Sequence, residues 1–174
     1  MRISFAIVCF VLVAGTAAGV RAQSPKATAN LQQQVNVMGQ AFLKGDYKTF
    51  ADYTYPGLLK MMGGKDKMET VMKGIMDGMK SSGMKFNKIS FDAPGKIVKV
   101  GKQLQGTVIQ HLDIKLTKGG AVSTSALIAI SDDDGDRWTF IDTQGKDIAA
   151  VKKAFPEISA ALVLPPPQKP VQYN

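Results

Sequence analysis

The spacing of apolar residues in the first half of the chain is helical. One stripe, recurring every three or four positions, consists of Leu31, Val35, Met38 and Phe42. Gly45 is expected to end this helix, because glycine tolerates the left-handed conformation found there, and Asp46 is expected to cap a short second helix. Pro56 should end that second helix, because proline disfavours helical geometry in the residue before it. Another apolar stripe, rich in methionine, predicts a third helix over about residues 65–82.

From residue 84 onward apolar and polar residues alternate with the period of a β-strand, and five strands are expected. The two longest strands carry apolar rows with one polar interruption each, Gln110 in the third strand and Thr124 in the fourth. Leu112 and Ile128 should be buried, because each lies in the middle of its row. A final apolar segment, 148–155, again has helical spacing. Three helices followed by antiparallel strands predict an α+β domain, in which the helices pack on a curved sheet with a pocket between the layers.

The first 22 residues have the features of a cleavable secretory signal peptide. Arg2 precedes an unbroken apolar run, and the small residues Val20 and Ala22 fit cleavage before Gln23. An uncleaved anchor is the alternative, although the apolar run is at the short edge of what spans a bilayer. The sequence therefore predicts export to the periplasm or the exterior, with no stable membrane insertion after cleavage.

The remainder divides into a polar lead-in (23–30), a single domain (31–164) and a Pro-rich tail (165–174). The only cysteine, Cys9, lies in the predicted signal peptide, so the exported domain has no disulfide. The chain has 22 basic and 14 acidic residues, and loss of Arg2 and Arg21 leaves 20 against 14, a net charge of +6. The lysines are scattered, which favours a role in solubility over attraction to anionic surfaces or acidic ligands. No nucleic-acid partner is expected, and a homodimer stays open.

Two parts of the chain resemble a known superfamily. The segment Gly45–Tyr53, with Tyr55-Pro56 and Gly63-Gly64-Lys65 after it, is similar to the early helices of the nuclear transport factor 2-like superfamily. The segment Asp136–Asp142 is similar to its last-strand tryptophan segment. The resemblance covers roughly residues 31–142 and suggests an exported bacterial member of unknown function. It implies a cone-like fold with a pocket between helices and sheet. Members include ketosteroid isomerases, polyketide cyclases, dehydratases and non-catalytic binding proteins, so the resemblance does not choose a function.

Few residues offer catalytic or metal-binding chemistry. An isomerase needs a carboxylate base and an oxyanion donor inside the pocket. The inward row of the third strand holds no acid, and its one polar side chain among apolar neighbours is Gln110. Asp52 and Tyr53 are candidates, although a surface aspartate on a helix is the commoner explanation. A single histidine, His111, excludes a histidine metal cluster, and the acidic run 132–136 is expected to form a turn rather than a calcium site. We therefore predict no metal and no cofactor.

The sequence favours an exported protein that binds a small, largely apolar molecule without transforming it. Pocket residues are drawn from the helical stripes and from the strands. The predicted ligand-binding residues are Phe42, Tyr53, Met76, Gln110, Thr124 and Trp138. One alternative is an isomerase, cyclase or dehydratase that uses the same pocket. A second is an envelope protein-interaction module that uses the outer face of the sheet.

Overall fold

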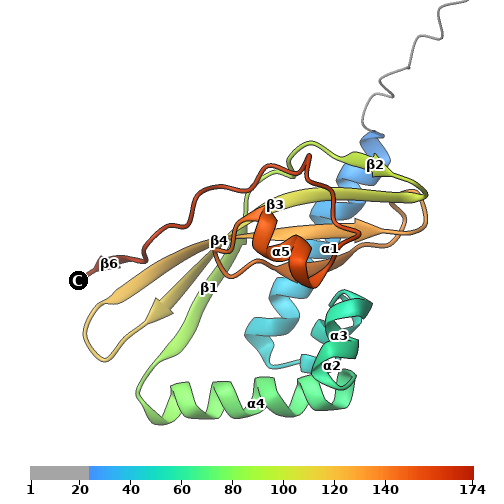
Figure 1. Ribbon diagram of the computed structural model, residues 1–174. Helices are drawn as coiled ribbons and strands as arrows, with labels where there is room; N and C mark the ends of the chain where they lie inside the picture. The colour runs from blue at the N-terminus through green and yellow to red at the C-terminus, as the bar shows by residue number, and fades with distance from the viewer. Residues whose placement is uncertain (1–23) are drawn as a thin grey trace, which may run out of the picture.

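A computed structural model describes residues 24–174, and the predicted signal peptide lies outside this range. The fold is α+β, with helices preceding an antiparallel sheet (Figure 1). The helices are α1 (Pro25–Lys44), α2 (Tyr47–Asp52), α3 (Pro56–Met62), α4 (Lys65–Ser81) and α5 (Ile148–Ala154). The strands are β1 (Lys85–Phe91), β2 (Val98–Val100), β3 (Gln103–Lys115), β4 (Gly120–Ser131), β5 (Thr139–Asp142) and β6 (Val171–Tyr173). In this part of the chain no helix combines the length and the apolar character needed to cross a membrane.

The helix boundaries follow local chemistry, with one correction. Gly45 ends α1 in the left-handed conformation (φ 74°), and the Asp46 side chain caps α2 by accepting a hydrogen bond from the backbone N–H of Thr49. Four helices, not three, precede the sheet in the described residues, because Pro56 begins α3 as well as lying beyond α2. The first helical position needs no backbone donor, so proline is well suited to it. α1 also starts at Pro25, within the expected polar lead-in.

The sheet is antiparallel, with neighbouring strands in the order β1-β3-β4-β5. The short strands β2 and β6 pair with β3 and β4, respectively. The predicted Pro-rich tail therefore contributes a sixth strand, β6, which pairs Val171 with Val122 and Tyr173 with Gly120.

Both faces of the sheet are covered, so the molecule has three layers (Figure 1). On the helix-side face, Leu31 and Val35 of α1 pack against a cluster that includes Val108 and Leu127. On the α5-side face, a second cluster joins the sheet to α5 and to the segment that follows it. Its members are Ile128, Ile130, Ile141, Val151, Phe155, Ile158 and Leu162. The predicted arrangement, with N-terminal helices packed on the sheet, is therefore incomplete, because α5 and the segment after it cover the other face.

The strand register decides which side chains share a face. Gln110 lies opposite Ser125, and His111 lies opposite Thr124. Even-numbered residues of β3 thus share a face with odd-numbered residues of β4. The two predicted rows consequently lie on opposite faces, and only one of them faces α1.

Burial along β3 and β4 is uneven. Ile128 is fully buried, as predicted, whereas Leu112 is only half-buried, and the prediction for it is wrong. Leu112 lies beyond the part of the helix-side face where the α1 cluster gathers. α4 is likewise covered at one end only, because Met68 packs beneath α2 and α3 while Ile75 remains 50% exposed.

Candidate functional site

Two of the six predicted ligand-binding residues are part of the core. The ring of Phe42 contacts Phe50 and Phe86, with centroid distances of 5.5 and 4.8 Å. Trp138 is fully buried, and its indole N–H donates to the carbonyl of Gly135 at 3.1 Å. Both side chains therefore have a packing role that needs no ligand.

The two polar candidates lie on opposite faces and have protein partners. On the helix-side face, the Gln110 amide donates to Ser125 Oγ at 2.8 Å and to Asp142 Oδ2 at 2.7 Å. On the α5-side face, Thr124 Oγ1 lies 3.1 Å from His111 Nδ1. Neither group therefore needs a ligand to satisfy its hydrogen bonding.

The remaining two candidates lie at separate places. Met76 is half-buried on α4, and Tyr53 is half-buried directly after α2. The structure thus gathers Phe42 and Gln110 on the helix-side face of the sheet, with Thr124 on the other face. The six residues do not surround one site.

Asp142 is a candidate that the sequence search missed. Its carboxylate accepts hydrogen bonds from three donors: Gln110 at 2.7 Å, Ser125 Oγ at 3.2 Å and the Gln144 backbone N–H at 2.8 Å. Asp142 is nevertheless exposed, and it forms no ion pair with a lysine or arginine among residues 24–174. Residues two apart on a strand share a face. Because Phe140 belongs to the helix-side cluster, Asp142 also lies on the helix-side face.

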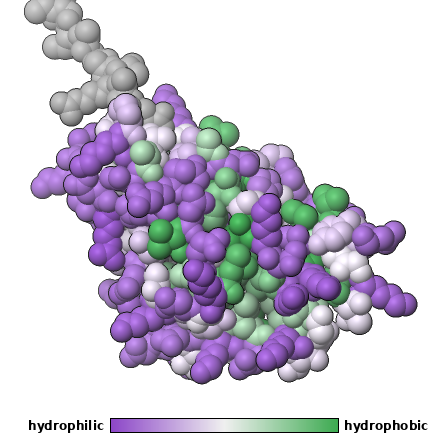
Figure 2. All heavy atoms as spheres, turned by 180° about the vertical axis from the view of Figure 1, so that it is seen from behind, coloured by the Kyte–Doolittle hydropathy of each residue, from purple (hydrophilic) through white to green (hydrophobic). Residues whose placement is uncertain are grey.

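We call Gln110, Ser125 and Asp142 the polar trio. It lies on three adjacent strands, and half-buried apolar side chains border it on the same face. Next to Gln110 these are Phe91, which lies opposite it, and Leu112; Phe86 and Ile114 lie further along β1 and β3. The molecule seen from this side has apolar side chains gathered in the middle, bordered by polar ones (Figure 2). A few convergent polar groups in an apolar setting are typical of small-molecule sites.

Two hollows lie elsewhere, on either side of Asp52 and Arg137. The first has a volume of about 230 Å³ and is lined by α2, α3, β4 and the start of β5, including Lys65. The second has a volume of about 330 Å³ and includes Gln34, Thr49 and Tyr53 in its lining. α2 is held beside this region because the Phe140 N–H donates to the Tyr53 carbonyl at 2.8 Å.

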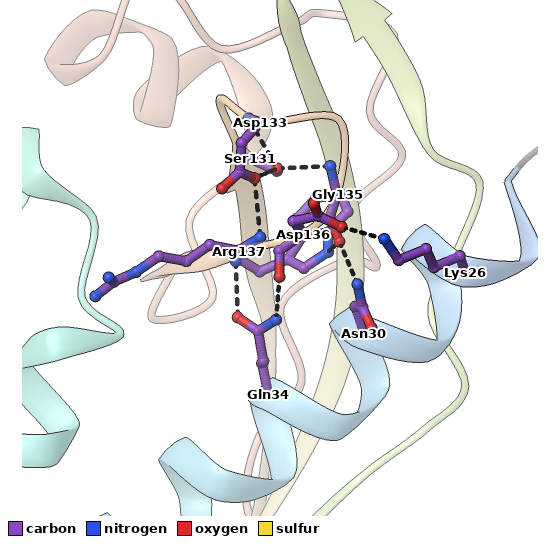
Figure 3. A network of polar contacts seen from close by, with 9 residues as sticks. Lys26, Asn30, Gln34, Ser131, Asp133, Gly135, Asp136 and Arg137 are labelled. Carbon is purple, nitrogen blue, oxygen red and sulfur yellow. Dashed lines mark hydrogen bonds and ion pairs between the residues drawn. The ribbon is translucent and has the colours of Figure 1, made fainter.

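The loop that carries Arg137 is fixed to α1 (Figure 3). Asn30 donates to the Gly135 carbonyl at 2.9 Å, and Gln34 donates to the Asp136 carbonyl at 2.8 Å. Within the loop, Asp133 Oδ1 accepts from the Arg137 backbone N–H at 2.8 Å. These contacts hold the backbone while the Arg137 side chain extends away from α1 (Figure 3).

Charges around the loop are largely paired. The hydrogen bond from Lys65, followed by the charges of Lys65, Arg137 and Lys48, lowers the pKa of Asp52. The backbone hydrogen bond from Arg137 is the main cause that lowers the pKa of Asp133. Both carboxylates therefore stay ionised at neutral pH.

No group of three or more metal-ligating side chains occurs among the described residues. No protein-family model matches the chain, and no curated protein matches it significantly. The functional argument therefore rests on the geometry of the polar trio.

Proposed function

We propose that this chain is an exported, non-catalytic protein that binds a small, largely apolar molecule on the helix-side face of its sheet. The proposal includes the nuclear transport factor 2-like, cone-like arrangement, with the ligand between the helices and the strands. The binding region would include Phe42, Gln110, Ser125 and Asp142, bordered by the half-buried apolar side chains of β1 and β3.

The observation that carries the proposal is the exposed Asp142 carboxylate beside an apolar surface. Gln110 and Ser125 hold the carboxylate in one orientation, and no described cation neutralises it. A hydroxyl or amine on an otherwise apolar ligand would donate to this carboxylate and leave its body on Leu112 and Ile114. Such charge-assisted hydrogen bonds are stronger than neutral ones, so one polar contact can orient the molecule.

Native mass spectrometry of the protein purified from its own envelope tests the proposal. We expect the wild type to retain a small molecule, and Asp142→Asn and Gln110→Leu to retain less of it. Thr124→Val is the matched control, because Thr124 is adjacent to Ser125 but lies on the other face, and it should leave retention unchanged. A wild type that retains nothing, or equal losses in Gln110→Leu and Thr124→Val, would contradict the proposal.

Asp142 also keeps an enzyme of the isomerase or cyclase type as a second candidate. It supplies a carboxylate on the helix-side face, as such a reaction needs, whereas no tyrosine hydroxyl is bonded to it in the described residues. Asp52 is a weaker candidate for the base, because it is bonded to Lys65 at the edge of the fold. Turnover of a ketosteroid-like or polyketide-like substrate that Asp142→Asn abolishes would favour the enzyme over the binding protein.

Export is tested separately by N-terminal sequencing of the protein from its own cells. We expect the chain to begin at Gln23, because Val20 and Ala22 fit the signal-peptidase pattern. Membrane-bound protein that begins at Met1 would contradict export with cleavage.

A further inference from the structure

Lysines that are scattered along the sequence meet at one end of the fold. They come from the last turn of α4, the first half of β1, and the end of β3 with the turn after it (Figure 1). The strand register places Lys85 directly opposite Lys115. The two turns also approach each other, because a Cβ atom at Gly83 would lie 3.2 Å from Thr117 Oγ1. We call the five exposed lysines gathered here the lysine end: Lys80, Lys85, Lys88, Lys115 and Lys118.

Positive charge exceeds negative charge at the lysine end. None of its lysines forms an ion pair within residues 24–174. The segments that carry them, 77–88 and 113–120, hold two acidic side chains, Asp77 and Asp113, against the five lysines. Asp113 lies opposite Lys88 in the register and accepts hydrogen bonds from the Tyr173 hydroxyl at 2.5 Å and from Asn87 at 3.3 Å. An excess of cationic side chains therefore remains after both carboxylates are counted.

The needs of the fold do not explain this arrangement. Like charges directly opposite each other on neighbouring strands destabilise a sheet, so the Lys85–Lys115 pair works against folding. Lysines on an edge strand hinder pairing with other chains, which accounts for Lys85 and Lys88 on β1. Lys115, however, lies on β3, where Lys85 and Gly120 pair with it from both sides. A lysine at this interior position protects no edge, which points to an anionic partner.

The α5-side face also presents apolar surface at this end. Lys115 and Asp113 share this face, because residues two apart on a strand point the same way. The Tyr173 ring lies over Gly120, where no side chain stands in its way, and its hydroxyl reaches Asp113. Tyr173 is 44% exposed, and Val171, two residues earlier on β6, is 69% exposed. Cationic, aliphatic and aromatic side chains therefore lie next to one another.

We propose that the lysine end, together with Val171 and Tyr173, docks the exported protein on the surface of a membrane that contains anionic lipids. The lysine ammonium groups would contact lipid phosphates, and each basic residue close to such a surface strengthens the attachment. The exposed valine and tyrosine would enter the boundary between headgroups and acyl chains, where tyrosine is enriched. A soluble acidic partner would match the charges but gives no reason for the two exposed apolar side chains.

This surface goes beyond the proposed function, because its residues are separate from the polar trio. The trio lies on the helix-side face, whereas Lys115 and Tyr173 lie on the α5-side face. One face can hold a ligand while the other meets a membrane, so the two proposals can fail independently.

Sedimentation of the exported protein with lipid vesicles tests the proposal. Vesicles of phosphatidylcholine and phosphatidylglycerol in equal parts should bind the protein, and pure phosphatidylcholine vesicles should bind it much more weakly. Binding should weaken as salt is added, because salt screens charges at a surface. No binding to the anionic vesicles, or equal binding to both kinds, would overturn the proposal. Binding of soluble polyglutamate in place of the anionic vesicles would show an acidic macromolecular partner and would also overturn it.

Variants then locate the surface. Lys85→Gln/Lys115→Gln should weaken binding to the anionic vesicles roughly ten-fold or more, because two basic residues are lost from the contact. The matched control is Lys96→Gln/Lys102→Gln, which removes the same charge near the opposite end of β3 and should leave binding nearly unchanged. Thermal unfolding should find Lys85→Gln/Lys115→Gln no less stable than the wild type, because a like-charge pair is removed. Equal weakening by the two double variants would show diffuse charge attraction and overturn the assignment.

Discussion

The two faces of the sheet are buried by different means. On the helix-side face a single long helix, α1, covers part of the strands and leaves Phe86, Leu112 and Ile114 half-buried. On the α5-side face, the seven-residue α5 and the segment after it close over Ile128 and Ile130. The α5-side face also keeps half-buried apolar side chains, Ile109 and Val122, so the two faces differ in how they are covered and not in whether apolar surface is left over.

The polar groups on the two faces differ in the same way. Gln105, fully buried on the α5-side face, donates to the Glu157 carbonyl at 3.1 Å and accepts from the Ser159 N–H at 2.8 Å. It thereby fastens the covering segment to β3. Gln110 on the helix-side face bonds to two side chains, Ser125 and Asp142, and fastens no covering segment. Gln110 holds no covering segment in place, so it is the glutamine that is available to contact a ligand.

Truncating one apolar residue on each face gives the largest expected difference. Ile128→Ala should lower the free energy of unfolding by about 2–5 kcal/mol, because it empties a fully buried position. Leu112→Ala should cost only about 1–2 kcal/mol, because that side chain is half-buried. Urea unfolding of both variants measures the two costs. Equal costs would show that the helix-side face is as well covered as the other.

The two buried glutamines provide a smaller contrast. Gln105→Leu should cost about 1–3 kcal/mol, because Gln105 is fully buried and the change removes two hydrogen bonds that hold the segment after α5 to β3. Gln110→Leu should cost less than about 1 kcal/mol, because Asp142 is exposed and Ser125 half-buried, so water can replace the lost bonds. Thermal unfolding of the two variants, compared with the wild type, checks the order. A larger loss from Gln110→Leu would contradict the distinction between the faces.

Much of the fold could be predicted from local patterns. Gly45 and Asp46 mark the junction of α1 and α2 because their conformational and capping preferences need no tertiary information. Pro56 was ambiguous, since a proline both disfavours a helix before it and suits the first position of a helix after it. β6 could not be foreseen, because three exposed residues after a Pro-rich run are too few for alternation to indicate a strand.

The candidate site was harder to predict, because it depends on register. Alternation shows which residues of one strand share a face, but not which face of the next strand they join. Gln110 and Thr124 were grouped as polar interruptions, whereas the β3–β4 register pairs Gln110 with Ser125. Asp142 escaped notice although Phe140, two residues earlier, is an apolar core residue on the same face.

The attachment of the segment that follows α5 to the rest of the fold should also weaken at alkaline pH. Tyr55 donates its hydroxyl hydrogen bond to Glu157 Oε1 at 2.6 Å, and its ring packs edge-on against Phe155 at 5.8 Å. Burial, followed by the bond to Glu157 and the nearby negative charges, raises the pKa of Tyr55. The raised pKa means that the folded state holds this proton more tightly than the unfolded chain does.

The stabilisation from Tyr55 should therefore be complete below about pH 10, the ordinary value for tyrosine, and be lost as the pH rises above it. Tyr55→Phe should unfold more easily than the wild type at pH 8, and the gap should narrow between about pH 10 and 11. Urea unfolding at a series of pH values measures this gap. Tyr173→Phe is the control. Tyr173 lies on the exposed strand β6 and bonds to Asp113 of β3, so it does not hold the segment after α5 in place. If the gap stays constant from pH 8 to 11, the Tyr55–Glu157 bond does not fasten the segment after α5 to the rest of the fold.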